Sequence, residues 1–120
     1  MTCKKISEFS SKLGTDEDWI YIGDFLDYFY SNPSADSLDE PVWTNQSDYT
    51  KSFISAMAAQ LAFNYGFKIP KWTKDEKYIL KEPHFAMNAK GNLRLVLLAE
   101  SPKFFRDRNI YTTDNVLGRV

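Results

Sequence analysis

The most restrictive feature of this 120-residue sequence is a run of sixteen uncharged residues, Ser52–Phe67. A membrane-spanning helix needs about 20 predominantly apolar residues, and this run is shorter and contains Ser, Gln and Asn. Its large apolar residues repeat at helical spacing, and its small residues form a second face that would let another helix approach closely. A helix that is apolar or small nearly all round is normally central. We therefore predict a buried central helix over about 48–65, capped by Ser47 and ended at Gly66.

A second amphipathic helix is predicted over about Asp16–Tyr30, ahead of the helix-breaking Pro33. Thr15 and Asp18 have the spacing of a capping box. The apolar stripe of this helix, which we expect to face the core, consists of Trp19, Ile22, Leu26 and Phe29.

Three further elements are predicted around these two helices. Helical spacing places the first over about Lys4–Leu13, and a capping box of Thr73 and Glu76 precedes a short helix. Ser101-Pro102 opens another, because proline is favoured at a first helical position. The run 93–99 suits either a buried helix or a buried strand, and its leucines favour the helix.

These elements predict an all-α fold, a single domain over 1–120 with five or six helices around the central one. The length matches one domain, and the apolar and aromatic content (43% and 16%) excludes a disordered chain. Residues 1–13 contain no apolar run of the secretory type, so we expect a cytoplasmic protein that is not membrane-bound.

The balanced net charge of −1 hides an asymmetry along the chain. Residues 1–60 carry four cations and ten anions, whereas residues 61–120 carry eleven cations and six anions. Two interpretations remain open. The halves neutralise each other in the fold, or the molecule has one acidic and one basic face for partners.

Two groups of residues are candidates for binding a partner. On the predicted second helix, tyrosines and carboxylates share a face that periodicity places away from the core, and either another element covers it or a protein partner does. In the C-terminal half, cations alternate with aromatic residues, as on surfaces that bind nucleic acid. The candidate residues are Tyr21, Asp24, Asp27, Tyr28, Arg94, Lys103, Arg106 and Arg108.

The residues needed for common catalytic chemistry are scarce. With one cysteine (Cys3) and one histidine (His84), the chain cannot form a disulfide framework, a multi-thiolate metal site or a histidine pair. It also has no glycine-rich phosphate loop. An enzyme would have to use Asp24, Asp27 and His84, so we expect no catalytic residue, cofactor or bound metal.

The C-terminal half resembles a bacterial domain associated with toxin–antitoxin-like operons. The resemblance covers about Ile69–Leu117, and its most specific motif is Glu100-Ser101-Pro102 followed by Arg106-Asp107-Arg108-Asn109-Ile110-Tyr111. It implies a bacterial, cytosolic, non-enzymatic protein that acts through a protein partner, as an antitoxin-like or neutralising factor for a toxin encoded nearby. The same motif has a structural interpretation, in which Arg106 or Arg108 pairs with the acidic second helix.

The expected function is therefore a non-enzymatic protein–protein interaction module, antitoxin-like in character. The alternative is a nucleic-acid-associated regulator that uses the basic and aromatic C-terminal region. An enzyme is a third and weaker alternative.

Overall fold

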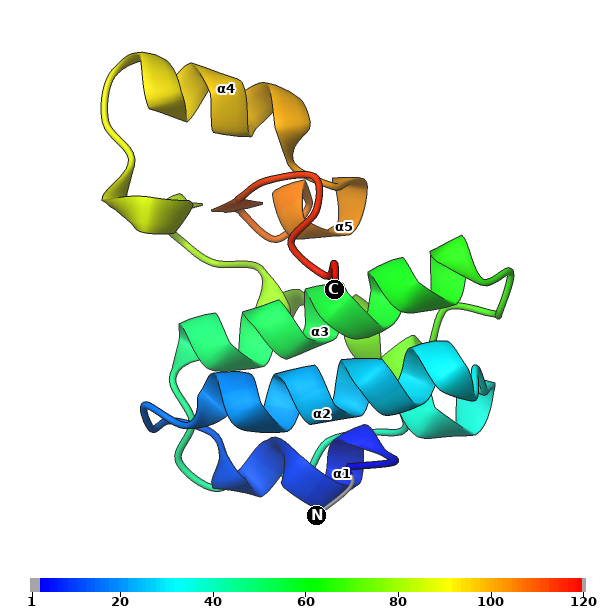
Figure 1. The fold of residues 1–120 in the computed structure, drawn as a ribbon. Helices are drawn as coiled ribbons and strands as arrows, with labels where there is room; N and C mark the ends of the chain where they lie inside the picture. The colour runs from blue at the N-terminus through cyan, green and yellow to red at the C-terminus, as the bar shows by residue number, and fades with distance from the viewer. Residues whose placement is uncertain (1–2, 120) are drawn as a thin grey trace.

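The structure is a computed structural model that describes residues 3–119. This part of the chain is mainly helical, which confirms the all-α prediction (Figure 1). Two short strands, β1 and β2, pair in parallel, with His84 opposite Ile110 and Phe85 opposite Tyr111. The bounds are α1 Ile6–Phe9, α2 Asp18–Ser31, α3 Asp48–Asn64, β1 His84–Phe85, α4 Asn92–Glu100, α5 Lys103–Arg106 and β2 Ile110–Tyr111. Within residues 3–119, no helix combines the length and apolar character needed to cross a membrane.

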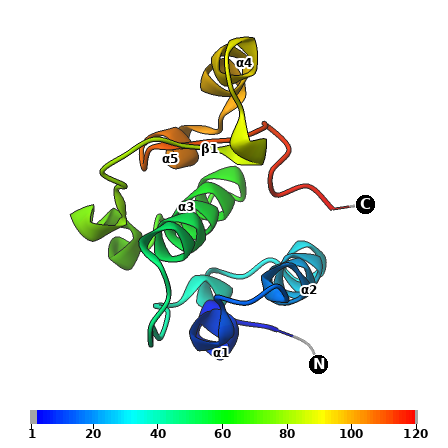
Figure 2. The ribbon, with the colours of Figure 1, turned by 90° about the vertical axis from the view of Figure 1, so that its left-hand side faces the viewer.

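Helix α3 is the central helix predicted from the uncharged run. The side chain of Ser47 accepts a hydrogen bond from the Thr50 backbone N–H at 3.1 Å, and Gly66 adopts a left-handed φ of +73° just beyond the other end. Figures 1 and 2 show α1 and α2 on one side of α3, and α4 and α5 on the other. Its fully buried side chains pack in the same core as Phe9, Phe25, Phe29 and Phe105 from α1, α2 and α5.

The apolar stripe of α2 differs from the prediction at its first residue. Ile22, Leu26 and Phe29 are buried as expected, but Trp19 is 64% exposed, and Phe25 completes the buried face. Trp19 lies in the first turn of α2, where its ring meets that of Phe53 at 6.0 Å between centroids and an interplanar angle of 84°. Periodicity identifies the inward face of a helix, but it does not show where the neighbouring elements stop covering it.

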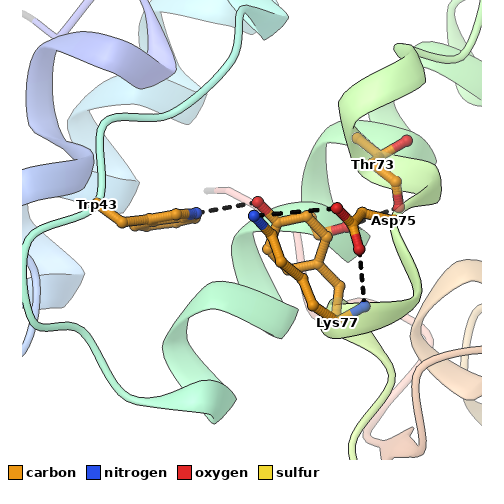
Figure 3. A network of polar contacts seen from close by, with 6 residues as sticks. Trp43, Thr73, Asp75 and Lys77 are labelled. Atoms are coloured by element: carbon orange, nitrogen blue, oxygen red, sulfur yellow. Dashed lines mark hydrogen bonds and ion pairs between the residues drawn. The ribbon is translucent and has the colours of Figure 1, made fainter.

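The region 71–80 forms two 3₁₀ turns in place of the predicted short helix. Asp75 caps the second turn by accepting a hydrogen bond from the Lys77 backbone N–H at 3.0 Å, a role predicted for Thr73 and Glu76. Tyr78 ties this region to the rest, since its hydroxyl accepts from Trp43 Nε1 at 2.9 Å and its carbonyl from Ser52 Oγ at 2.5 Å. Figure 3 shows this polar cluster, in which Trp43 lies beside Thr73, Asp75 and Lys77 of the 71–78 region.

The C-terminal segment returns to α2. Tyr30 Oη donates a hydrogen bond to the Leu117 carbonyl at 2.5 Å, and Arg119 forms an ion pair with Asp27 at 2.9 Å. The expected pairing of Arg106 or Arg108 with the acidic helix is wrong for the described residues, because Arg119 supplies the cation that reaches it.

Candidate functional site

Helix α4 exposes apolar side chains around most of its circumference. The structure confirms a helix at 93–99, but the expectation that this element is buried is wrong, since Leu97 is its one buried residue. A helix of this composition is expected to be covered on several sides. The exposed apolar residues are Leu93 (41%), Leu95 (64%), Val96 (45%) and Leu98 (40%).

Polar contacts at the two ends of α4 hold it in place, in addition to its packing on β2. At the C-terminal end, Ser101 Oγ donates to the Thr112 carbonyl at 3.1 Å and accepts from the Thr112 backbone N–H at 2.8 Å. At the N-terminal end, Arg94 Nε donates to the Ala89 carbonyl at 2.8 Å, and its guanidinium lies 4.6 Å from the centroid of the Phe85 ring. These contacts position the helix and leave its outer side chains in solvent.

An aromatic strip connects α4 with the first turns of α2 and α3. The rings of Trp19 and Tyr49 both lie against Phe53, and Tyr49 stacks on His84 with 4.0 Å between centroids. His84 belongs to β1, whose Phe85 lies under Arg94. We call these residues, Trp19, Tyr49, Phe53, His84 and Phe85, the aromatic strip.

A cleft of about 100 Å³ opens at the α2 end of this strip. Apolar and aromatic side chains form most of its wall, and the carboxylate residue Asp18 is part of its lining. The cleft is narrow enough to take a single side chain rather than a drug-sized ligand, for which pockets of about 300–1,000 Å³ are usual. The lining residues are Asp18, Trp19, Ile22, Tyr49, Thr50, Phe53 and Ile54.

The two ends of the strip differ in charge. The cleft end carries Asp16, Glu17, Asp18 and Asp48 against one cation, Lys51, in the first turns of α2 and α3 and the residues just before them. The segment 90–103 around α4 carries three cations, Lys90, Arg94 and Lys103, against Glu100. Within residues 3–119, the Arg119–Asp27 ion pair is the one that joins the acidic and basic halves of the sequence. Direct ion pairs among the described residues therefore neutralise little of the charge difference between residues 1–60 and residues 61–120.

The predicted acidic and tyrosine face of α2 is engaged by the chain itself. Asp24 accepts a hydrogen bond from the Cys3 backbone N–H at 2.6 Å, and Asp27 is paired with Arg119, which lowers the pKa of the Asp27 carboxyl. The ammonium groups of Lys4 and Lys12 lie 5.7 and 6.0 Å from the ring centroids of Tyr28 and Tyr21. Residues near both ends of the described chain, together with Lys12, thus contact this face.

The four predicted basic residues have different environments. Arg108 is 7% exposed, and its guanidinium donates to Ser55 Oγ, the Phe104 carbonyl and the Thr73 carbonyl at 2.9, 2.8 and 2.6 Å. Burial lowers the pKa of Arg108. Arg94 is held against Phe85, and Lys103 pairs with Asp107 at 2.8 Å, whereas Arg106 is exposed. Arg108 is thus placed to join α3, α5 and the 71–74 turn rather than to meet a partner.

The residues considered for catalysis are not brought together. The His84 ring lies against Tyr49, and burial lowers the pKa of His84. Asp24 and Asp27 bind Cys3 and Arg119 instead. No group of three or more potential metal ligands occurs in the part of the chain that the structure describes.

The sequence did not indicate that α4, the cleft and the rings of Trp19 and Tyr49 lie at the surface, whereas Phe53 of the aromatic strip is buried beneath them. Leu93–Ala99 was visible as an apolar run, but its pattern is that of a buried element, so nothing local distinguishes it from α3. The cleft depends on Trp19 being exposed, which the helical spacing did not indicate.

Comparison with known proteins adds no further constraint. No protein-family model matches the chain, and neither the curated proteins nor the solved structures include a match.

Proposed function

We propose that this chain is a protein–protein interaction module whose docking surface is α4 and the adjoining aromatic strip. The observation that carries the proposal is the exposure of Leu93, Leu95, Val96 and Leu98 on one helix. Monomeric proteins seldom expose large contiguous apolar patches, and patches rimmed by charged residues commonly mark interaction sites. A partner that covers these four side chains removes their apolar surface from water, which is favourable by about 25 cal/mol per Å².

In this function the chain acts by binding a protein partner rather than by catalysing a reaction. This proposal is supported by the dispersal of His84, Asp24 and Asp27 over separate structural contacts. The resemblance of Ile69–Leu117 to a domain of toxin–antitoxin-like operons supports a narrower version, in which this bacterial, cytoplasmic protein neutralises a toxin encoded beside it. Co-expression with the neighbouring gene would test that version by rescue of growth.

The experiment that tests the general proposal is photo-crosslinking in cells. A photoreactive amino acid at Leu95 is expected to yield a discrete crosslinked product. The matched control is the same group at Ile79, which is 52% exposed but lies outside α4 and the aromatic strip. Equal crosslinking from both positions, or none from Leu95, would count against α4 as the docking surface.

The alternative of nucleic-acid binding rests on the same basic region. Of its four predicted residues, Arg108 is buried and Lys103 is paired with Asp107, which reduces the charge available for phosphates. Titration of labelled single-stranded and duplex DNA and RNA at low salt distinguishes the two functions. Binding that weakens steeply as salt rises, as counterion release requires, would favour the alternative.

A further inference from the structure

We infer that the occupant of this docking surface is a second copy of the same chain, which packs antiparallel to the first across a two-fold axis. This inference rests on the proposed function and names its partner. In the dimer, α4 of each copy covers the cleft end of the other, and an outer leucine of α4, such as Leu95, enters the cleft beside Trp19.

The cleft end and the N-terminal end of α4 lie on one side of the molecule, so a two-fold axis can bring the α4 end of each copy to the cleft end of the other. Helices α2, α3 and α4 all begin on the side that faces the viewer in Figure 2. The cleft is built by the first turns of α2 and α3, and the Tyr49–His84 stack joins it to β1 beneath α4. In an isologous interface each surface meets its complement twice, so the dimer closes without free contact sites.

Charge complementarity favours the antiparallel orientation. The cleft end is acidic, through Asp16, Glu17, Asp18 and Asp48, and the N-terminal end of α4 is basic, through Lys90 and Arg94. A parallel arrangement would bring like charges together at both ends, which disfavours it. The antiparallel arrangement pairs opposite charges twice.

The area required by a stable dimer explains why both ends take part. A specific interface buries about 800 Å² per partner, a patch about 28 Å across. Helix α4 has nine residues and is about 13 Å long, so it cannot supply this patch alone. The molecule measures 39 × 30 × 28 Å, so a patch of this size fits on one side of it only if it extends from α4 toward the cleft.

The test is the mass of the full chain in solution, measured by sedimentation equilibrium over about 1–100 µM. We expect a dimer that dissociates on dilution and that high salt weakens. Leu95→Asp and Trp19→Asp should each give a monomer, whereas Ile79→Asp, the matched exposed control, should remain dimeric. Circular dichroism melting of each variant distinguishes loss of association from loss of folding.

A charge exchange tests the orientation without touching the apolar contacts. Asp16→Lys and Lys90→Glu should each weaken the dimer at least threefold, and the double variant should recover most of that loss. Mixing Leu95→Asp with Trp19→Asp should restore a heterodimer, because one α4–cleft contact remains intact in the mixture.

Three results would overturn the inference. They are a monomer at every concentration, an assembly that grows beyond two copies, and a dimer that Leu95→Asp breaks but Trp19→Asp does not, which would indicate α4–α4 pairing. A monomer that still crosslinks to another protein through Leu95 would overturn the second copy as occupant and leave the proposed function standing. A monomer with no such crosslink would remove both.

Discussion

Helices α3 and α4 are both apolar over most of their length, yet one is the centre of the core and the other lies on the surface. Ten of the seventeen residues of α3 are buried, whereas Leu97 is the one buried residue of α4. The difference comes from their neighbours. Layers of structure cover α3 on two sides, while α4 packs on β2 and has no layer beyond it (Figure 1). The apolar residues of α3 thus form the core, whereas those of α4 form an exposed surface.

The strongest test of this comparison is truncation of equivalent leucines in the two helices. Leu61→Ala should lower the free energy of unfolding by about 2–5 kcal/mol, because Leu61 is fully buried and its removal leaves a cavity. Leu95→Ala, at a site that is 64% exposed, should change it by about 0.5 kcal/mol or less in the monomer. Urea denaturation measures both, and similar losses for the two variants would contradict the contrast.

The next largest effect concerns Arg108, which connects α3 to the C-terminal region. Arg108→Met should cost about 1–3 kcal/mol of unfolding free energy, because buried acceptors, including the Thr73 carbonyl, lose their donor. Arg106→Met is the matched control, since Arg106 is exposed, and we expect a change within about 0.5 kcal/mol. A neutral Arg108→Met would show that this residue does not stabilise the fold and would return it to the list of partner-binding candidates.

A third prediction concerns the N-terminal segment that covers α2. Burial, together with the hydrogen bond and negative charge of Asp24, raises the pKa of the Cys3 thiol from 9.0 to about 11. Because the thiolate is the reactive form, the folded chain should hold about a hundredfold less of it at pH 8 than the unfolded chain. Alkylation of the native protein should be slower by at least that factor, and Asp24→Asn should accelerate it. Equal rates in native and unfolded chains would show that the segment does not dock on α2.

The smallest expected effect is a pH dependence at the aromatic strip. Burial lowers the pKa of His84, so the unfolded chain binds the proton more readily than the folded chain. His84 should therefore support the fold fully above its unfolded value, about 6.5, and this contribution should diminish as the pH falls below it. Thermal melting between pH 7.5 and 5 should show a decrease that is smaller in His84→Gln than in the parent chain. An identical decrease in both would assign the pH dependence to other groups.

The helices were predictable from the sequence, and most of the candidate surface was not. Ser47, Gly66 and Pro33 mark helix ends through local interactions that hold in any tertiary setting. The exposure of Trp19, the coverage of Asp24 by Cys3 and the burial of Arg108 depend on residues far away along the chain. Hydrophobic periodicity carries no information about such neighbours.

The sequence alone therefore determined that α2 and α3 are helical and that α3 is apolar enough to be central, because capping, helix breaking and side-chain periodicity act within a few turns. Only the tertiary structure decided that α4 lies uncovered by the rest of residues 3–119, that the acidic face of α2 contacts Cys3 and Arg119, and that a cleft opens beside Trp19. Burial depends on how many layers pack against an element, and that number is a property of the whole assembly of helices.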